Sequence, residues 1–127
     1  MSISELKITT EHIQRQDKEI ITIFHLRGWL DSQSESTLIA AAQEEFSQGI
    51  RYLVVNLEEI QMLTSAGIRA VQKLHKLFES SNPDPATVRL KLCSAPQQVH
   101  HALALTGILQ TIPMYESLQA VLISYNK

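Results

Sequence analysis

The sequence has little of the material from which metal sites, disulfides and nucleotide-binding loops are built. Cys93 is its only cysteine, so no disulfide can form within the chain. The five histidines make neither an H-E-x-x-H motif nor a Cys/His cluster of metal-ligand spacing. With four glycines there is no Walker loop, no G-x-G-x-x-G and no G-x-S-x-G elbow. We therefore expect no catalytic residue, metal or cofactor, and a protein that is not an enzyme.

An excess of charge and long apolar runs are missing too. Eleven Lys and Arg stand against thirteen Asp and Glu, so nothing draws the chain as a whole to nucleic acid. No stretch approaches the roughly 18 apolar residues of a membrane span, and residues 1–7 lack the features of a secretory signal. The 127 residues, 44% of them hydrophobic, fit one globular domain (1–127), which we expect in the cytoplasm.

What is present is an alternation of strand-like and helix-like patterns. Period-two alternation and apolar runs predict strands at 6–13, 20–26, 52–57, 88–93 and 109–112. The first two are joined by a polar turn at 14–18, and the apolar run 52–57 suits the middle of a sheet. After the opening hairpin, strands alternate with helices, which indicates an α/β fold with a mixed sheet.

Helix signals lie between these strands. Gly28 and Asp31 indicate a break in the chain after the second strand. Ser32 to Glu35 then has the spacing of a capping box. The helix that follows buries one face and ends near Gly49. Further helices are predicted from about Ser65 to Phe78, at 96–105 with Gly107 as its stop, and at 115–124. The polar segment 80–85 is a connection whose two prolines exclude a helix.

Ser65 stands out because it lies where a strand gives way to a helix. A helix start has unpaired N–H groups and partial positive charge, which would receive a phosphate on Ser65. The alternative is that Ser65 only caps the helix, since serine is favoured there for that purpose. Gly67 favours the functional interpretation, because it removes a side chain where a partner or phosphate would approach.

Basic residues continue from Ser65 along the predicted helix. Arg69, Lys73 and Lys76 follow at offsets of 4, 8 and 11, which places them on one exposed stripe. The stripe is either an ordinary solvated face or a docking surface for an acidic partner, together with Thr64, Ala66 and Gly67. Asp31, after Trp29, is either a turn residue or part of the same recognition surface.

Four segments together resemble the STAS domain of anti-sigma factor antagonists. They are Gly28-Trp29-Leu30-Asp31, Val54 to Ile60, Leu63-Thr64-Ser65-Ala66-Gly67-Ile68, and Leu105 to Ile108 with Ser117 to Ala120. The resemblance spans nearly the whole chain. It implies a mixed sheet of four to five strands flanked by about four helices. It also implies that Ser65 is the phosphoacceptor, with Gly67 and Asp31 as the other matching positions.

In this family the unphosphorylated protein binds a serine protein kinase that doubles as an anti-sigma factor and so releases the sigma factor. Phosphorylation of the serine disables binding, and a PP2C-type phosphatase restores it. Many members have aspartate before the acceptor, whereas this chain has Thr64, itself a candidate second acceptor. We also include a weak homodimer among the expected partners.

An alternative is a constitutive STAS subunit of a lipid-transport complex, or of phosphatase-controlled signalling without a sigma factor. In that case Ser65 would be only a helix cap.

Overall fold

The computed structural model describes residues 5–15, 17, 19–84 and 87–125, so parts of the predicted 14–18 turn and of the proline-containing connection, including Pro85, lie outside the description. In chain order the described elements are β1 (Lys7–Gln14), β2 (Ile20–Leu30), α1 (Glu35–Ser47), β3 (Tyr52–Leu63), α2 (Ser65–Glu79), β4 (Leu90–Cys93), α3 (Gln97–Leu105), the 3-10 helix η1 (Ile108–Gln110), β5 (Met114–Tyr115) and α4 (Leu118–Ser124).

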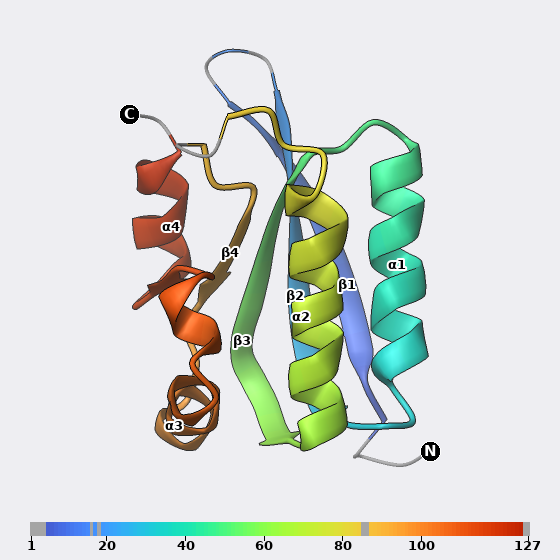
Figure 1. The fold of residues 1–127 in the computed structure, drawn as a ribbon, viewed down its shortest axis with the longest axis vertical. Coiled ribbons are helices and arrows are strands. Elements are labelled where there is room, and N and C mark those ends of the chain that lie inside the picture. The colour runs from blue at the N-terminus through green and yellow to red at the C-terminus, as the bar shows by residue number, and fades with distance from the viewer. Residues whose placement is uncertain (1–4, 16, 18, 85–86, 126–127) are drawn as a thin grey trace.

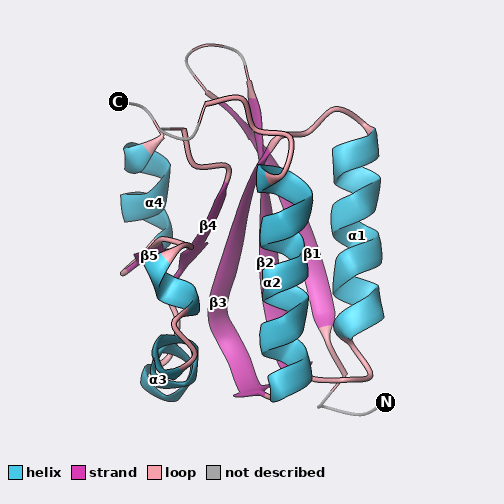
Figure 2. Cartoon of the chain, in the orientation of Figure 1, coloured by secondary structure: helices cyan, strands magenta, loops and turns pink. Residues whose placement is uncertain are grey.

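These strands form a mixed sheet in the order β1-β2-β3-β4-β5, with β1 antiparallel to β2 and the remaining neighbours parallel. Helices α1 and α2 lie side by side against the sheet (Figures 1 and 2). The described part of the chain therefore confirms the predicted α/β fold, with five strands and four α-helices. It also confirms that the apolar run 52–57 belongs to the middle strand.

The sheet has two unequal hydrophobic faces. The larger one lies under α1 and α2 and includes the fully buried Leu38, Leu74 and Phe78. On the smaller one, Val121 and Tyr125 pack over the adjoining strand residues Ile21, Ile23, Val54 and Cys93. Cys93 is fully buried, as predicted for a small apolar thiol, and burial raises the pKa of that thiol.

Strand β2 runs past the predicted end at Leu26, so the prediction that Gly28 interrupts the strand is wrong. Its pairing with β3 shifts register between His25 and Arg27 and again between Gly28 and Trp29. At each shift β3 contributes one more residue than β2, which is the geometry of a β-bulge. The positive φ of Gly28, 106°, suits this irregular stretch.

Two other local predictions are wrong. Helix α1 begins at Glu35 without a capping box, because Ser34 stands in its N-cap position with its hydroxyl donating to the Trp29 carbonyl and accepting from the Asp31 N–H. The apolar run 109–112 is not a strand: η1 covers its first half, and the fifth strand follows at β5. Gly107 starts this turn at φ 78°, which tightens the chain before it can extend.

Candidate functional site

The two adjacent hydroxyls at the start of α2 have different surroundings. Thr64 is the N-cap: its backbone is extended and its Oγ1 accepts the Gly67 N–H at 3.3 Å. Ser65 is the first helical residue, is exposed, and its hydroxyl makes no hydrogen bond to any described residue. The interpretation of Ser65 as the helix cap is therefore wrong, because Thr64 has that role.

Backbone donors are available beside the Ser65 hydroxyl. Thr64 satisfies two of the first N–H groups of α2, since its Oγ1 accepts from Gly67 and its carbonyl from Ile68 at 2.9 Å. The N–H groups of Ser65 and Ala66 have no acceptor among the described residues. Unpaired donors at the positive end of a helix are the setting in which proteins hold phosphate and carboxylate groups.

The start of α2 is tied to the end of β2. The Thr64 N–H donates to the Leu30 carbonyl at 3.1 Å, and a Cβ on Gly67 would lie 2.2 Å from that same oxygen. Gly67 is therefore needed for close packing of helix and strand, and not to open space for a partner as predicted. Ala66 is buried as well, so a partner would reach these two residues mainly through their backbone, and their contact with a partner stays a prediction.

Asp31 directly follows Leu30 and so lies next to this helix start. Its carboxylate accepts the N–H groups of Gln33 and Ser34, both at 3.1 Å, and lies 3.1 Å from the Ser34 hydroxyl oxygen. This local turn confirms the interpretation of Asp31 as a turn residue. The contact of Asp31 with a partner stays a prediction.

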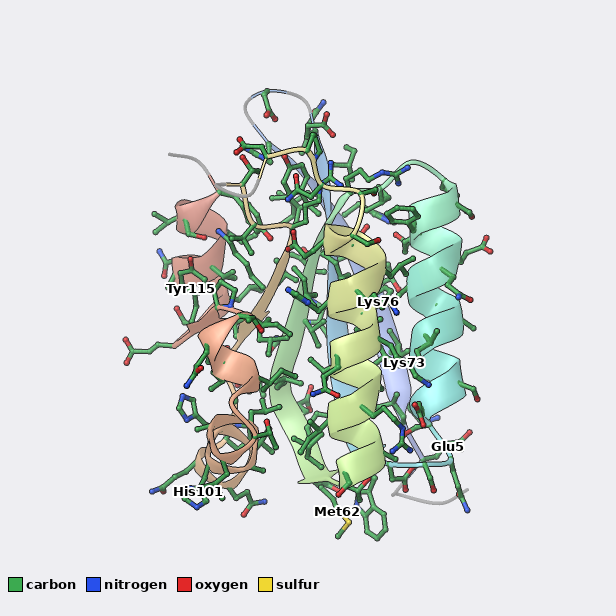
Figure 3. The ribbon with its side chains drawn as sticks, in the orientation of Figure 1. Glu5, Met62, Lys73, Lys76, His101 and Tyr115 are labelled. Atoms are coloured by element: carbon green, nitrogen blue, oxygen red, sulfur yellow. The ribbon has the colours of Figure 1, made fainter. Side chains whose placement is uncertain are left out.

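The basic stripe is exposed, as predicted, but two of its members already have an anionic neighbour. Glu35, the first residue of α1, accepts Lys73 Nζ at 2.9 Å and both Nε and Nη2 of Arg69 at 3.3 Å. These bonds lower the pKa of the Glu35 carboxyl, with Lys73 the larger influence and Arg69 the next. Lys76 pairs with no acidic side chain among the described residues. Figure 3 shows Lys73 and Lys76 along α2.

The sequence pattern predicts a capping role for Glu35 but not its ion pair with Arg69, which lies 34 residues later in the chain. The local signal at Glu35 is an acidic residue in the first turn of a helix, a position favoured by the helix dipole. Glu35 joins α1 to α2 and reduces the positive charge that the stripe would offer to an acidic partner.

The described residues include no helix that combines the length and the apolar character that crossing a membrane requires. No three or more of their His, Cys, Asp and Glu side chains are grouped in a way that could hold a metal ion. The Nε2 atoms of His12 and His25 instead lie 2.7 Å from Glu45 and 2.9 Å from Glu11, in separate pairs.

Comparison with known proteins gives a family match and several similar structures. The STAS domain family model matches residues 12–121. An anti-sigma factor antagonist from Mycobacterium paratuberculosis superposes with a TM-score of 0.76 at 17% identity, over 95% of this chain and 96% of that one. Because identity is below 25%, this likeness concerns the fold.

Three further solved structures share the fold. The anti-sigma factor antagonist SpoIIAA in its unphosphorylated form gives a TM-score of 0.70 at 17% identity, covering 91% of this chain and 93% of that one. Its phosphorylated form, from Bacillus, also matches, with a TM-score of 0.64 at 16% identity over 91% and 96%. A murine Solute Carrier 26 anion transporter gives 0.71 at 14% identity, covering 97% of this chain but 22% of the transporter.

Proposed function

We propose that this chain, which belongs to the STAS domain family, is an anti-sigma factor antagonist controlled by reversible phosphorylation of Ser65. Its partner is a serine protein kinase that also acts as an anti-sigma factor. That kinase transfers the γ-phosphoryl group of ATP to Ser65 Oγ, which loses its proton, and ADP leaves. A PP2C-type phosphatase hydrolyses the ester with water and restores the serine.

The observation that carries this proposal is the exposed Ser65 hydroxyl, which no described residue binds, beside the N–H groups of Ser65 and Ala66, which have no acceptor among the described residues. Capping does not explain Ser65, because Thr64 performs it. The local packing does not use the hydroxyl either. A kinase can therefore reach this oxygen without unfolding the start of α2.

Phosphorylation changes the charge of the surface much more than its shape. It adds about −1.5 to −2 charges at neutral pH, and the helix start stabilises part of that charge. In a complex that covers Ser65, the phosphate must lose water without a cation prepared for it, because Arg69 already pairs with Glu35. An unmatched anion in an interface costs several kcal/mol, or about a hundredfold in affinity.

Thr64 supports this mechanism although many family members have aspartate there. Threonine and aspartate can both cap a helix, and the bond from the Gly67 N–H to Thr64 Oγ1 shows threonine doing so here. Because that oxygen also lies 3.5 Å from the Leu30 carbonyl, Thr64 is less available than Ser65 as a second acceptor. A phosphate on Ser65 would meet no carboxylate at position 64.

The test uses each purified serine kinase of the anti-sigma factor type encoded in the same genome. We expect one of them to bind the wild type and Ser65→Ala, and to bind Ser65→Asp about a hundredfold more weakly. Ser80→Asp is the matched control, because Ser80 is an exposed serine at the other end of α2. Equal affinity of wild type and Ser65→Asp would show instead a constitutive STAS subunit and would overturn the proposal.

A further inference from the structure

Trp29 and Met62 form an apolar pair at the end of the sheet where α2 begins. They are register partners on the neighbouring strands β2 and β3. Met62 is 41% exposed, and Trp29 is partly exposed. Figure 3 shows Met62 at this end of the sheet, beside the first turn of α2. Two large apolar side chains are thus side by side with access to solvent.

The position of the pair follows from the two bulges in β3. On the sheet face that carries this pair, Ile23 and Val54 are fully buried register partners. The next partners on this face, His25 and Asn56, are polar and joined by a side-chain hydrogen bond of 3.0 Å. After the first bulge the exposed Arg27 and Glu59 are partners, and after the second bulge Trp29 and Met62 follow. Bulges commonly redirect side chains at functional sites. Here the face becomes apolar again beyond two polar pairs.

The pair lies at the end of the sheet where α2 begins, on the sheet face that carries Ile23 and Val54. Met62 lies three residues before Ser65, and Leu30, which follows Trp29, accepts the Thr64 N–H at 3.1 Å. The ends of β2 and β3 and the first turn of α2 are thereby held together. A protein that covers Ser65 and extends past this end of the sheet would reach Trp29 and Met62.

We propose that Trp29 and Met62 are the apolar anchor by which the kinase partner binds, an inference that rests on the proposed function. The occupant is an apolar side chain of that partner protein. Tryptophan is among the residues that contribute most binding energy at interfaces, and methionine adapts its shape to a neighbour. A phosphate on Ser65 would keep water next to this pair and so prevent the desolvation on which the anchor depends.

Substitution at the pair tests the proposal against a matched control. Trp29→Ala and Met62→Ala should each weaken binding of the kinase at least about tenfold. Leu105→Ala should change it less than about twofold, because Leu105 is 74% exposed on α3 without belonging to the pair. Circular dichroism verifies that each variant folds. If Trp29→Ala does not fold, the affinities of Met62→Ala and Met62→Gln for the kinase test the proposal.

The chain offers a direct readout, because Trp29 is its only tryptophan. With 5-fluorotryptophan incorporated, the single ¹⁹F resonance should shift when the purified kinase is added. It should stay unchanged when the kinase is added to Ser65→Asp.

The outcomes separate the two proposals. If Ser65→Asp loses binding while Trp29→Ala and Met62→Ala bind like the wild type and the resonance does not move, the anchor is wrong and the switch stands. If no such kinase binds the wild type, both are wrong.

Discussion

At the residue scale, Thr64 and Ser65 are neighbours whose removal should have different effects. Thr64→Ala removes the acceptor of the Gly67 N–H and should lower the free energy of unfolding by about 1 kcal/mol. Ser65→Ala removes an exposed hydroxyl and should change it by less than about 0.5 kcal/mol. Urea unfolding measures both, with Thr64→Asp as a control that keeps a capping oxygen. A loss at Ser65→Ala as large as that at Thr64→Ala would contradict the assignment of the cap.

Gly67 offers a second residue-scale prediction, in which two effects oppose each other. Alanine is favoured over glycine inside a helix by about 1 kcal/mol. The new Cβ would nevertheless lie 2.2 Å from the Leu30 carbonyl oxygen and 2.8 Å from Leu63 Cδ1, so helix and strand would have to separate. Gly67→Ala should therefore lower the free energy of unfolding by about 2 kcal/mol or more.

Gly49→Ala is the control for this clash, because a Cβ there meets no atom within 4 Å and tests only the positive φ of 98°. Its cost should be about 1 kcal/mol, measured by the same urea unfolding. A Gly67→Ala protein as stable as the wild type would show that the packing against Leu30 is not tight.

At the element scale, α1 and α2 are joined through Glu35, and this contact should make stability depend on pH. Arg69 and Lys73 lower the pKa of the folded carboxyl below its usual 4.5. The Glu35 carboxylate therefore contributes fully to the free energy of unfolding above its usual pKa. This contribution is lost as the pH falls through the lowered pKa of the folded protein. Glu35→Gln should be less stable than the wild type near neutral pH, and the difference should vanish on acidification.

Melting temperatures of both proteins, measured from about pH 7 to about pH 3, test this dependence. Glu44→Gln is the control, because Glu44 lies on the same helix with Gln48 and no described basic side chain as its partner. A difference between wild type and Glu35→Gln that is constant across the range would exclude the ion pairs as its cause.

The elements also show what periodicity can and cannot predict. Helix α2 was predictable because Val71, Leu74 and Phe78 recur at helical spacing and are all buried. The end of β2 could not be predicted in this way, because its register shifts depend on pairing with β3, about 30 residues away. The two-residue β5 is too short to give a pattern of its own.

At the scale of the whole molecule, the sequence predicted the position of Ser65 better than it predicted which residue caps α2. Ser65 lies on an exposed helix start, as predicted. That Thr64, and not Ser65, caps the helix follows only from the hydrogen bond between the Gly67 N–H and Thr64 Oγ1. The ion pairs of Glu35 and the closeness of Gly67 to Leu30 likewise depend on tertiary contacts that local spacing does not encode.

The central claim is that phosphorylation of Ser65 switches binding to the kinase partner. The most direct measurement phosphorylates the protein with that kinase, verifies by intact mass and peptide mapping that Ser65 carries the phosphate, and compares the Kd of the two separated forms for the same kinase. We predict a Kd about a hundredfold weaker for the phosphorylated form. Equal Kd values for the two forms, or a phosphate found only at another residue, would contradict the account.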